Sequence, residues 1–424
     1  MRLRHTLPAG ILDAGLASLA TLGIGVYAAH FLPTSVLGTY ALFFSSFLFA
    51  AVIPTQLVIA PAEFTTIRAS RTHRLSLLRQ MWRLGLPTAT IATVVATTVA
   101  CLGARAPARV LWALAVTAIA CSMISPFQDH VRRTLHLAGV SWRAALVSLV
   151  QLCTVVLSLG LFRLLRVGDA WHPLGALAIA NLVSMSTGLW ISRSETRAPA
   201  LPRYRVAQLV RSGRWLLLLE ATITGAMLAS SVLITRLASA DALGYAEAAR
   251  IVAQPVFVLM VGMGMALGPR SVEAGAALDQ AAARRIARPF AVILVTGALI
   301  YGTVTVTGWW GNPLSPFIPK AYVVDGLVPV SILGFLILGI SSPYRSELVG
   351  AGREHLFPRI AIIAGALQCS IALGSRWLES FARPVGLIAF SVVLLLALWR
   401  DRQAMYREPK TQESEEASGT SSGH

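Results

Sequence analysis

The sequence has few charged residues. Of its 424 residues, only 13% are Asp, Glu, Lys or Arg, whereas 55% are hydrophobic and the mean hydropathy is +0.67. A soluble protein carries about 25% charged residues, because its surface must be hydrated. The composition therefore excludes a water-soluble fold of this length and predicts an integral membrane protein.

Cysteine is also scarce. The four cysteines lie in apolar runs, and none has the CxxC or Cys/His spacing of a metal site. This pattern argues against a disulfide framework or a zinc site and predicts small core residues. The chain also lacks the G-x-x-x-x-G-K-[ST] sequence of a nucleotide-binding loop. We therefore expect no metal and no cofactor.

Long apolar windows are abundant. Because a membrane-spanning helix needs about 20 mainly apolar residues, the windows predict an all-α polytopic protein with twelve transmembrane helices. An open sheet edge is not viable in lipid, and a barrel would show alternating hydrophobicity. The expected spans are 9–31, 36–62, 84–103, 110–128, 144–163, 173–192, 215–237, 242–268, 290–308, 323–342, 359–375 and 384–400.

The 36 basic residues outnumber the 19 acidic ones. If the N-terminus is cytoplasmic, 27 of the 36 fall on the cytoplasmic side and eight in outer loops, and only Arg250 lies within a span. Arg and Lys accumulate on the cytoplasmic side of membrane proteins. The surplus therefore predicts that both termini are cytoplasmic, and no nucleic-acid partner is needed to explain it. Residues 401–424, which are rich in Ser, Glu, Thr and Gly beyond residue 407, are expected to be a disordered cytoplasmic tail.

The sequence repeats itself weakly. Ile-Leu-Asp-Ala at 11–14 is echoed by Leu-Leu-Glu-Ala at 218–221, and Leu-Gly-Thr-Tyr-Ala at 37–41 by Leu-Gly-Tyr-Ala at 243–246. A fainter echo joins 132–139 to 345–352. These echoes predict two six-helix halves.

The expected halves are residues 1–200 and 201–400. Because six is even, both start on the same side, so the repeats are parallel and the substrate path is expected at their interface.

A twelve-helix chain with these Leu-Gly-x-Tyr-Ala turns and an Arg-x-x-Leu-x-x-x-Gly connection after the fourth helix resembles the polysaccharide-exporter branch of the multidrug/oligosaccharidyl-lipid/polysaccharide (MOP) superfamily. The resemblance implies an O-antigen type flippase of the bacterial cytoplasmic membrane, made of two V-arranged bundles. It implies an undecaprenyl-diphosphate-linked glycan as substrate, membrane lipids as partners, and a polysaccharide polymerase or glycosyltransferases as further partners. The alternatives are a cation-coupled multidrug exporter of the same superfamily and a non-transporting scaffold for glycan assembly.

An enzyme is not expected. The longest outer connection, 309–322, carries one lysine and no acid, and no catalytic set stands out.

Ionisable residues inside spans are costly and are candidate functional sites. Arg250 is expected about 10 Å from the outer surface, with Glu247 one turn earlier. One hypothesis is that Arg250 faces the cavity and contacts a diphosphate, which suits the guanidinium geometry. The other is a closed structural pair with Glu247. His30 and Arg236, at matching ends of their helices, are candidates to grip a phosphate at the outer gate or simply reach the interface.

Asp13 and Glu220 occupy equivalent places in the two halves. An acid at this depth is a candidate for ion coupling, and the multidrug branch is known for such an acid in its first helix. The alternative is that each acid complements the positive end of its helix dipole.

Overall fold

The computed structural model describes residues 3–66, 70–193, 206–306 and 319–407, and these ranges contain helices and short connections but no strand. The long helices are α1 (Leu3–Phe31), α2 (Thr34–Pro54), α4 (Arg71–Gly103), α5 (Ala108–Leu137), α6 (Ser141–Leu164), α7 (His172–Ile191), α8 (Val206–Leu237), α9 (Ala240–Ala276), α10 (Gln280–Val306), α11 (Leu327–Gly350), α12 (Phe357–Leu373) and α14 (Ala382–Arg407). The short elements are the π-helical turn η1 (Thr55–Ile59), α3 (Ala60–Thr65), α13 (Ser375–Leu378) and the 3-10 turns η2 (Asp169–Trp171), η4 (Lys320–Tyr322), η5 (Glu354–Leu356) and η6 (Glu379–Phe381).

Twelve helical segments of the described chain are long and apolar enough to cross a bilayer, which confirms the predicted fold class. Several helices extend beyond their apolar windows. Helix α4 begins at Arg71 instead of residue 84, and α10 at Gln280 instead of residue 290. These added turns are polar but rich in good helix formers, so the helix continues past the apolar window, in α10 with Pro289 inside it.

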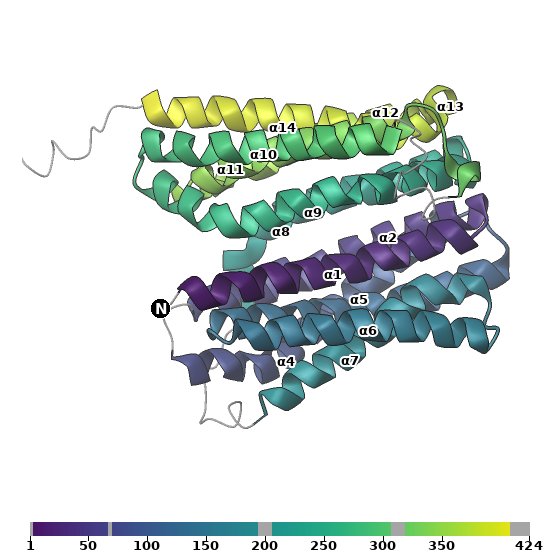
Figure 1. The fold of residues 1–424 in the computed structure, drawn as a ribbon, viewed down its shortest axis with the longest axis horizontal. Coiled ribbons are helices and arrows are strands. Elements are labelled where there is room, and N and C mark those ends of the chain that lie inside the picture. The colour runs from purple at the N-terminus through teal and green to yellow at the C-terminus, as the bar shows by residue number, and fades with distance from the viewer. Residues whose placement is uncertain (1–2, 67–69, 194–205, 307–318, 408–424) are drawn as a thin grey trace, which may run out of the picture.

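The helices form two bundles, α1–α7 and α8–α14 (Figure 1). The start of α1 and the end of α14 lie at the same end of the molecule. We call this end the terminal face and the other end the opposite face. The connection between the bundles, 194–205, lies outside the described residues.

The predicted tail begins later than expected. Helix α14 continues to Arg407, so residues 401–407 are helical and not disordered. Met405 is buried there, and Arg402 donates a 2.5 Å hydrogen bond to Glu347 of α11. These contacts hold the last turns of α14 against the bundle. Residues 408–424 lie outside the described residues.

The two bundles contact one another at the opposite face through the glycines of the repeated motif. A β-carbon placed on Gly38 would overlap the carbonyl oxygen of Ala240, and one placed on Gly244 would overlap that of Thr34. The repeat relates these two contacts to each other, because Gly38 corresponds to Gly244 and Thr34 corresponds to Ala240. Glycine lets the helix starts of α2 and α9 touch backbone to backbone.

A second reciprocal pair of contacts lies deeper. A β-carbon on Gly25 would lie 3.1 Å from Cγ1 of Ile251, and the Ser231 hydroxyl lies 3.2 Å from that of Ser45. Gly25 corresponds to Ser231 and Ser45 to Ile251, again at an offset of 206. The repeat detected in the sequence is therefore a pseudo-two-fold relation between the bundles in space.

We predict that Gly38→Ala destabilises the protein by about 1–3 kcal/mol, because the added methyl has no room beside Ala240. Gly10→Ala is the matched control. No atom lies within 4 Å of a β-carbon at Gly10, so that change is expected to be neutral or stabilising by up to about 1 kcal/mol. Thermal unfolding of the purified variants measures both, and equal stability of the two variants would contradict the backbone contact.

Candidate functional site

A carboxylate shared by two arginines lies where the bundles meet. Arg250 donates from Nε and Nη2 to the two oxygens of Glu247, at 2.9 and 2.7 Å. Arg383, at the start of α14, donates from Nη1 to Glu247 Oε2 at 2.6 Å. Glu247 is fully buried, whereas Arg250 keeps 17% of its side chain exposed. The three side chains form the charged cluster on which the candidate site is built.

The charged cluster also touches the other bundle. The guanidinium of Arg250 lies 5.4 Å from the ring centre of Phe44, a cation–π contact. Arg383 Nη2 reaches Ser45 Oγ at 3.5 Å. Both Phe44 and Ser45 belong to α2, so the cluster connects α9 and α14 of the second bundle with the first.

One carboxylate cannot neutralise two guanidinium groups, so the charged cluster carries a net charge of +1. Removing such charge from water is expensive unless a counter-charge is present. Arg250 is ten residues into α9, about 15 Å from the helix start. This distance along α9 exceeds the 10 Å expected from the sequence, whereas Arg383 reaches the same carboxylate from the first turn of α14. An anionic ligand is the chemistry that this arrangement suits.

Asp13 lies in a separate, closed network. Arg132 of α5 donates to both of its oxygens, from Nε at 3.0 Å and from Nη2 at 2.8 Å. The Ser148 hydroxyl donates at 2.5 Å, and His136 Nε2 lies at 3.0 Å. The Asp13 side chain is 2% exposed. The carboxylate therefore ties α1 to α5 and α6 and has no side open to a transported ion.

The second half repeats this pairing with less burial. Arg345 of α11 donates to Glu220 of α8 at 2.5 Å, and the two side chains are 38% and 23% exposed. Because 132 and 345 begin the echoed connections of the two halves, the same acid–arginine pair joins the first helix of each half to its fourth.

His30 and Arg236 are not part of the charged cluster. Neither forms an ion pair or hydrogen bond with Glu247 within the described chain. Arg236 donates to the carbonyl of Leu102 in α4, so it bridges the two bundles at the opposite face. His30 is exposed at the end of α1, beside Phe31. The structure thus brings together Arg250 and Glu247 and leaves the other two candidates at the opposite face.

Arg383 falls in an outer loop between the spans expected from the sequence, so it was not among the predicted site residues. Arg132 and Arg345 were expected only to mark orientation, although the echo between their connections aligns them with each other as Asp13 aligns with Glu220. That alignment was the feature of the sequence that could have identified the two arginines as partners of the two acids. No group of three or more His, Cys, Asp or Glu side chains in the described ranges could hold a metal ion.

No protein-family model matches the sequence, and no curated protein matches it either. Solved structures do resemble the fold. An inward-facing multidrug resistance MATE family transporter of the MOP superfamily is 14% identical over 95% of each chain, with a TM-score of 0.61. An outward-facing one is 12% identical over 94% of this chain and 95% of that chain, with a TM-score of 0.63.

A MOP superfamily transporter from Pyrococcus furiosus is 12% identical over 95% of each chain, with a TM-score of 0.59. These likenesses show that the chain has the twelve-helix fold of these transporters. The polysaccharide-exporter branch stays a prediction.

We predict that Asp13→Asn lowers stability by about 3 kcal/mol, because it removes the buried carboxylate from Arg132 and leaves that arginine with only the exposed Asp129 as its acidic partner. Glu220→Gln is the matched change at the more exposed pair, with an expected cost of about 1 kcal/mol or less. Thermal unfolding in detergent measures the difference. The double variant Asp13→Asn/Arg132→Gln removes both charges and is expected to recover part of the loss. If Asp13→Asn costs no more than Glu220→Gln, the buried pair is not the stabilising contact.

Proposed function

We propose that this protein is an alternating-access flippase that moves a polyprenyl-diphosphate-linked oligosaccharide across a bacterial cytoplasmic membrane. The charged cluster of Glu247, Arg250 and Arg383 is the observation that carries the proposal. It presents a net positive charge at the interface of two repeats, which is where transporters built from repeats bind their substrates. Glycosyltransferases and a polymerase would supply and consume the glycan.

The distribution of arginine and lysine supports an orientation with the terminal face in the cytoplasm. In that orientation the opposite face is outward, and the described contacts close it. The two glycine contacts join α2 to α9 there, and Tyr322 donates a 2.5 Å hydrogen bond to the carbonyl of Leu32 across the bundles. The structure then represents a state closed to the outside, which would receive a headgroup from the cytoplasm.

A diphosphate suits the charged cluster because guanidinium groups bind phosphate oxygens with two parallel hydrogen bonds. Arg250 has the most exposed side chain of the three, at 17% against 9% for Arg383, and Arg383 can remain with Glu247 when Arg250 turns to a ligand. The glycan would occupy the path between the bundles while the polyprenyl tail stays in lipid.

The arginine-paired acids also favour an anionic substrate over cation coupling. Asp13 and Glu220, the candidate coupling acids, are each paired with an arginine. An acid held in this way would have to leave its partner before binding a proton or sodium ion. The Pyrococcus furiosus neighbour is described as having a binding pocket of reverse polarity that suggests a different function. A change of pocket charge is thus compatible with this fold.

We predict that Arg250→Gln lowers transport of a labelled undecaprenyl-diphosphate-linked oligosaccharide in proteoliposomes about tenfold to a hundredfold, the loss expected for one charge-assisted hydrogen bond. The fold is expected to persist, because Arg383 still neutralises Glu247. Arg376→Gln is the matched control, since Arg376 is exposed at the same face as Arg383. Unchanged transport by Arg250→Gln would rule out a role for the cluster in substrate binding.

The cation-coupled multidrug exporter is the second candidate, favoured by the multidrug resistance MATE transporters that share the fold. The two functions differ in what a deletion strain does. Accumulation of a lipid-linked glycan on the cytoplasmic leaflet, with unchanged drug susceptibility, supports the flippase. Increased drug susceptibility without that intermediate supports the exporter.

A further inference from the structure

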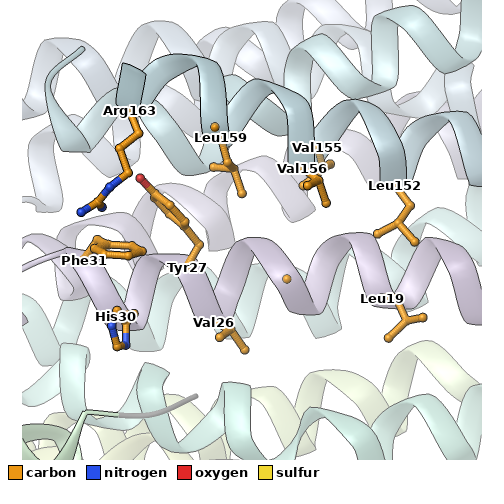
Figure 2. A pocket seen from close by; sticks show the side chains of 12 residues that line it. Leu19, Val26, Tyr27, His30, Phe31, Leu152, Val155, Val156, Leu159 and Arg163 are labelled. Atoms are coloured by element: carbon orange, nitrogen blue, oxygen red, sulfur yellow. The ribbon is translucent and has the colours of Figure 1, made fainter. Parts of the chain in front are cut away.

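A groove of about 450 Å³ lies between α1 and α6, apart from the charged cluster. Its walls are largely leucine and valine side chains of the two helices (Figure 2). The groove is open at Gly23 and Gly160, because a β-carbon placed at either position would have no atom within 4 Å. Leu19 and Val156 in its walls are 52% and 62% exposed, so the groove is open at the surface of the protein.

The groove has the length of one lipid leaflet. On α1 it runs from Leu19 to Phe31, which is about 18 Å at 1.5 Å per residue. Half of a hydrocarbon layer about 30 Å thick is about 15 Å. The groove therefore extends from the opposite face to the region of the bilayer centre, as the tail of a lipid in that leaflet does.

The end of the groove at the opposite face is basic. Arg163, the last basic residue of α6, lies over the ring of Phe31 at 4.0 Å from its centre and is exposed. His30 lines the same end. In Figure 2 Arg163, Tyr27 and Phe31 lie together at this end, whereas the rest of the groove is apolar. A cationic end on a leaflet-long apolar groove matches the phosphate and the chain of a phospholipid.

We propose that this groove is a binding site for one anionic phospholipid of the leaflet at the opposite face, with its phosphate at Arg163 and an acyl chain between α1 and α6. The site is independent of the flippase function, because it shares no residue with the charged cluster. A lipid there would brace α1 against α6 near the seam where Gly25 of α1 contacts Ile251 of α9.

The test is native mass spectrometry of the full chain released from nanodiscs of phosphatidylglycerol or of phosphatidylcholine. The wild-type protein is expected to retain one phosphatidylglycerol with a preference of about fivefold over phosphatidylcholine, the effect of one basic residue near an anionic headgroup. Arg163→Gln is expected to lose the preference. Gly160→Leu, which fills the groove, is expected to lose the retained lipid altogether.

Gly10→Leu is the matched control, since it adds the same side chain to α1 in open space outside the groove, and it is expected to retain the lipid. Thermal unfolding of each variant checks that it is folded. Retention by Gly160→Leu at the wild-type level would overturn the site, and an unchanged preference in Arg163→Gln would overturn the headgroup assignment. In a third arm, undecaprenyl phosphate is added to the nanodiscs. Its retention in place of phosphatidylglycerol would assign the groove to the transported lipid and overturn the proposed occupant.

Discussion

The burial of one carboxylate between two arginines is the constraint on which the rest of this structure depends. Charges within membrane-spanning helices are tolerated only when they are paired and face protein. Glu247 satisfies that condition for Arg250 and Arg383 together, but the balance leaves one positive charge. The cluster can hold this surplus because it lies at the contact of two bundles, against Phe44 and Ser45. It joins α2 of the first bundle to α9 and α14 of the second, so rocking of the bundles must change its contacts with α2.

The repeat separates what supports the fold from what is specific to the site. Each half has one acid–arginine pair, Asp13–Arg132 in the first and Glu220–Arg345 in the second. Each half also contributes one of the two glycine contacts at the opposite face. Features present in both halves serve the architecture that the halves share. Arg250 has no counterpart, because the matching residue is Phe44, and the two residues meet across the pseudo-two-fold axis. The charged cluster, whose three side chains all come from the second half, therefore lies at the symmetric contact between the bundles, where a substrate path is expected.

The sequence predicted the features that depend on local composition. Apolar windows located all twelve spans, and i, i+3 spacing on a helix placed Glu247 beside Arg250. It failed where a partner is distant in the chain. Arg383 lies 136 residues from Glu247, and no period or window links them. The start of α4 at Arg71 was missed because a helix can continue through polar turns beyond the apolar window. Asp13 was expected to be interfacial or ion-coupling, and only the packing of α1 on α5 showed its arginine partner.

The central claim is that the surplus positive charge at the contact of the bundles recognises an anionic headgroup. The most direct measurement compares the affinities of the protein in nanodiscs for undecaprenyl diphosphate and for undecaprenol, which share a tail and differ in the diphosphate. The account predicts that the diphosphate binds about tenfold more tightly or better, and that Arg250→Gln removes most of the difference. Equal affinities for the two lipids would contradict it.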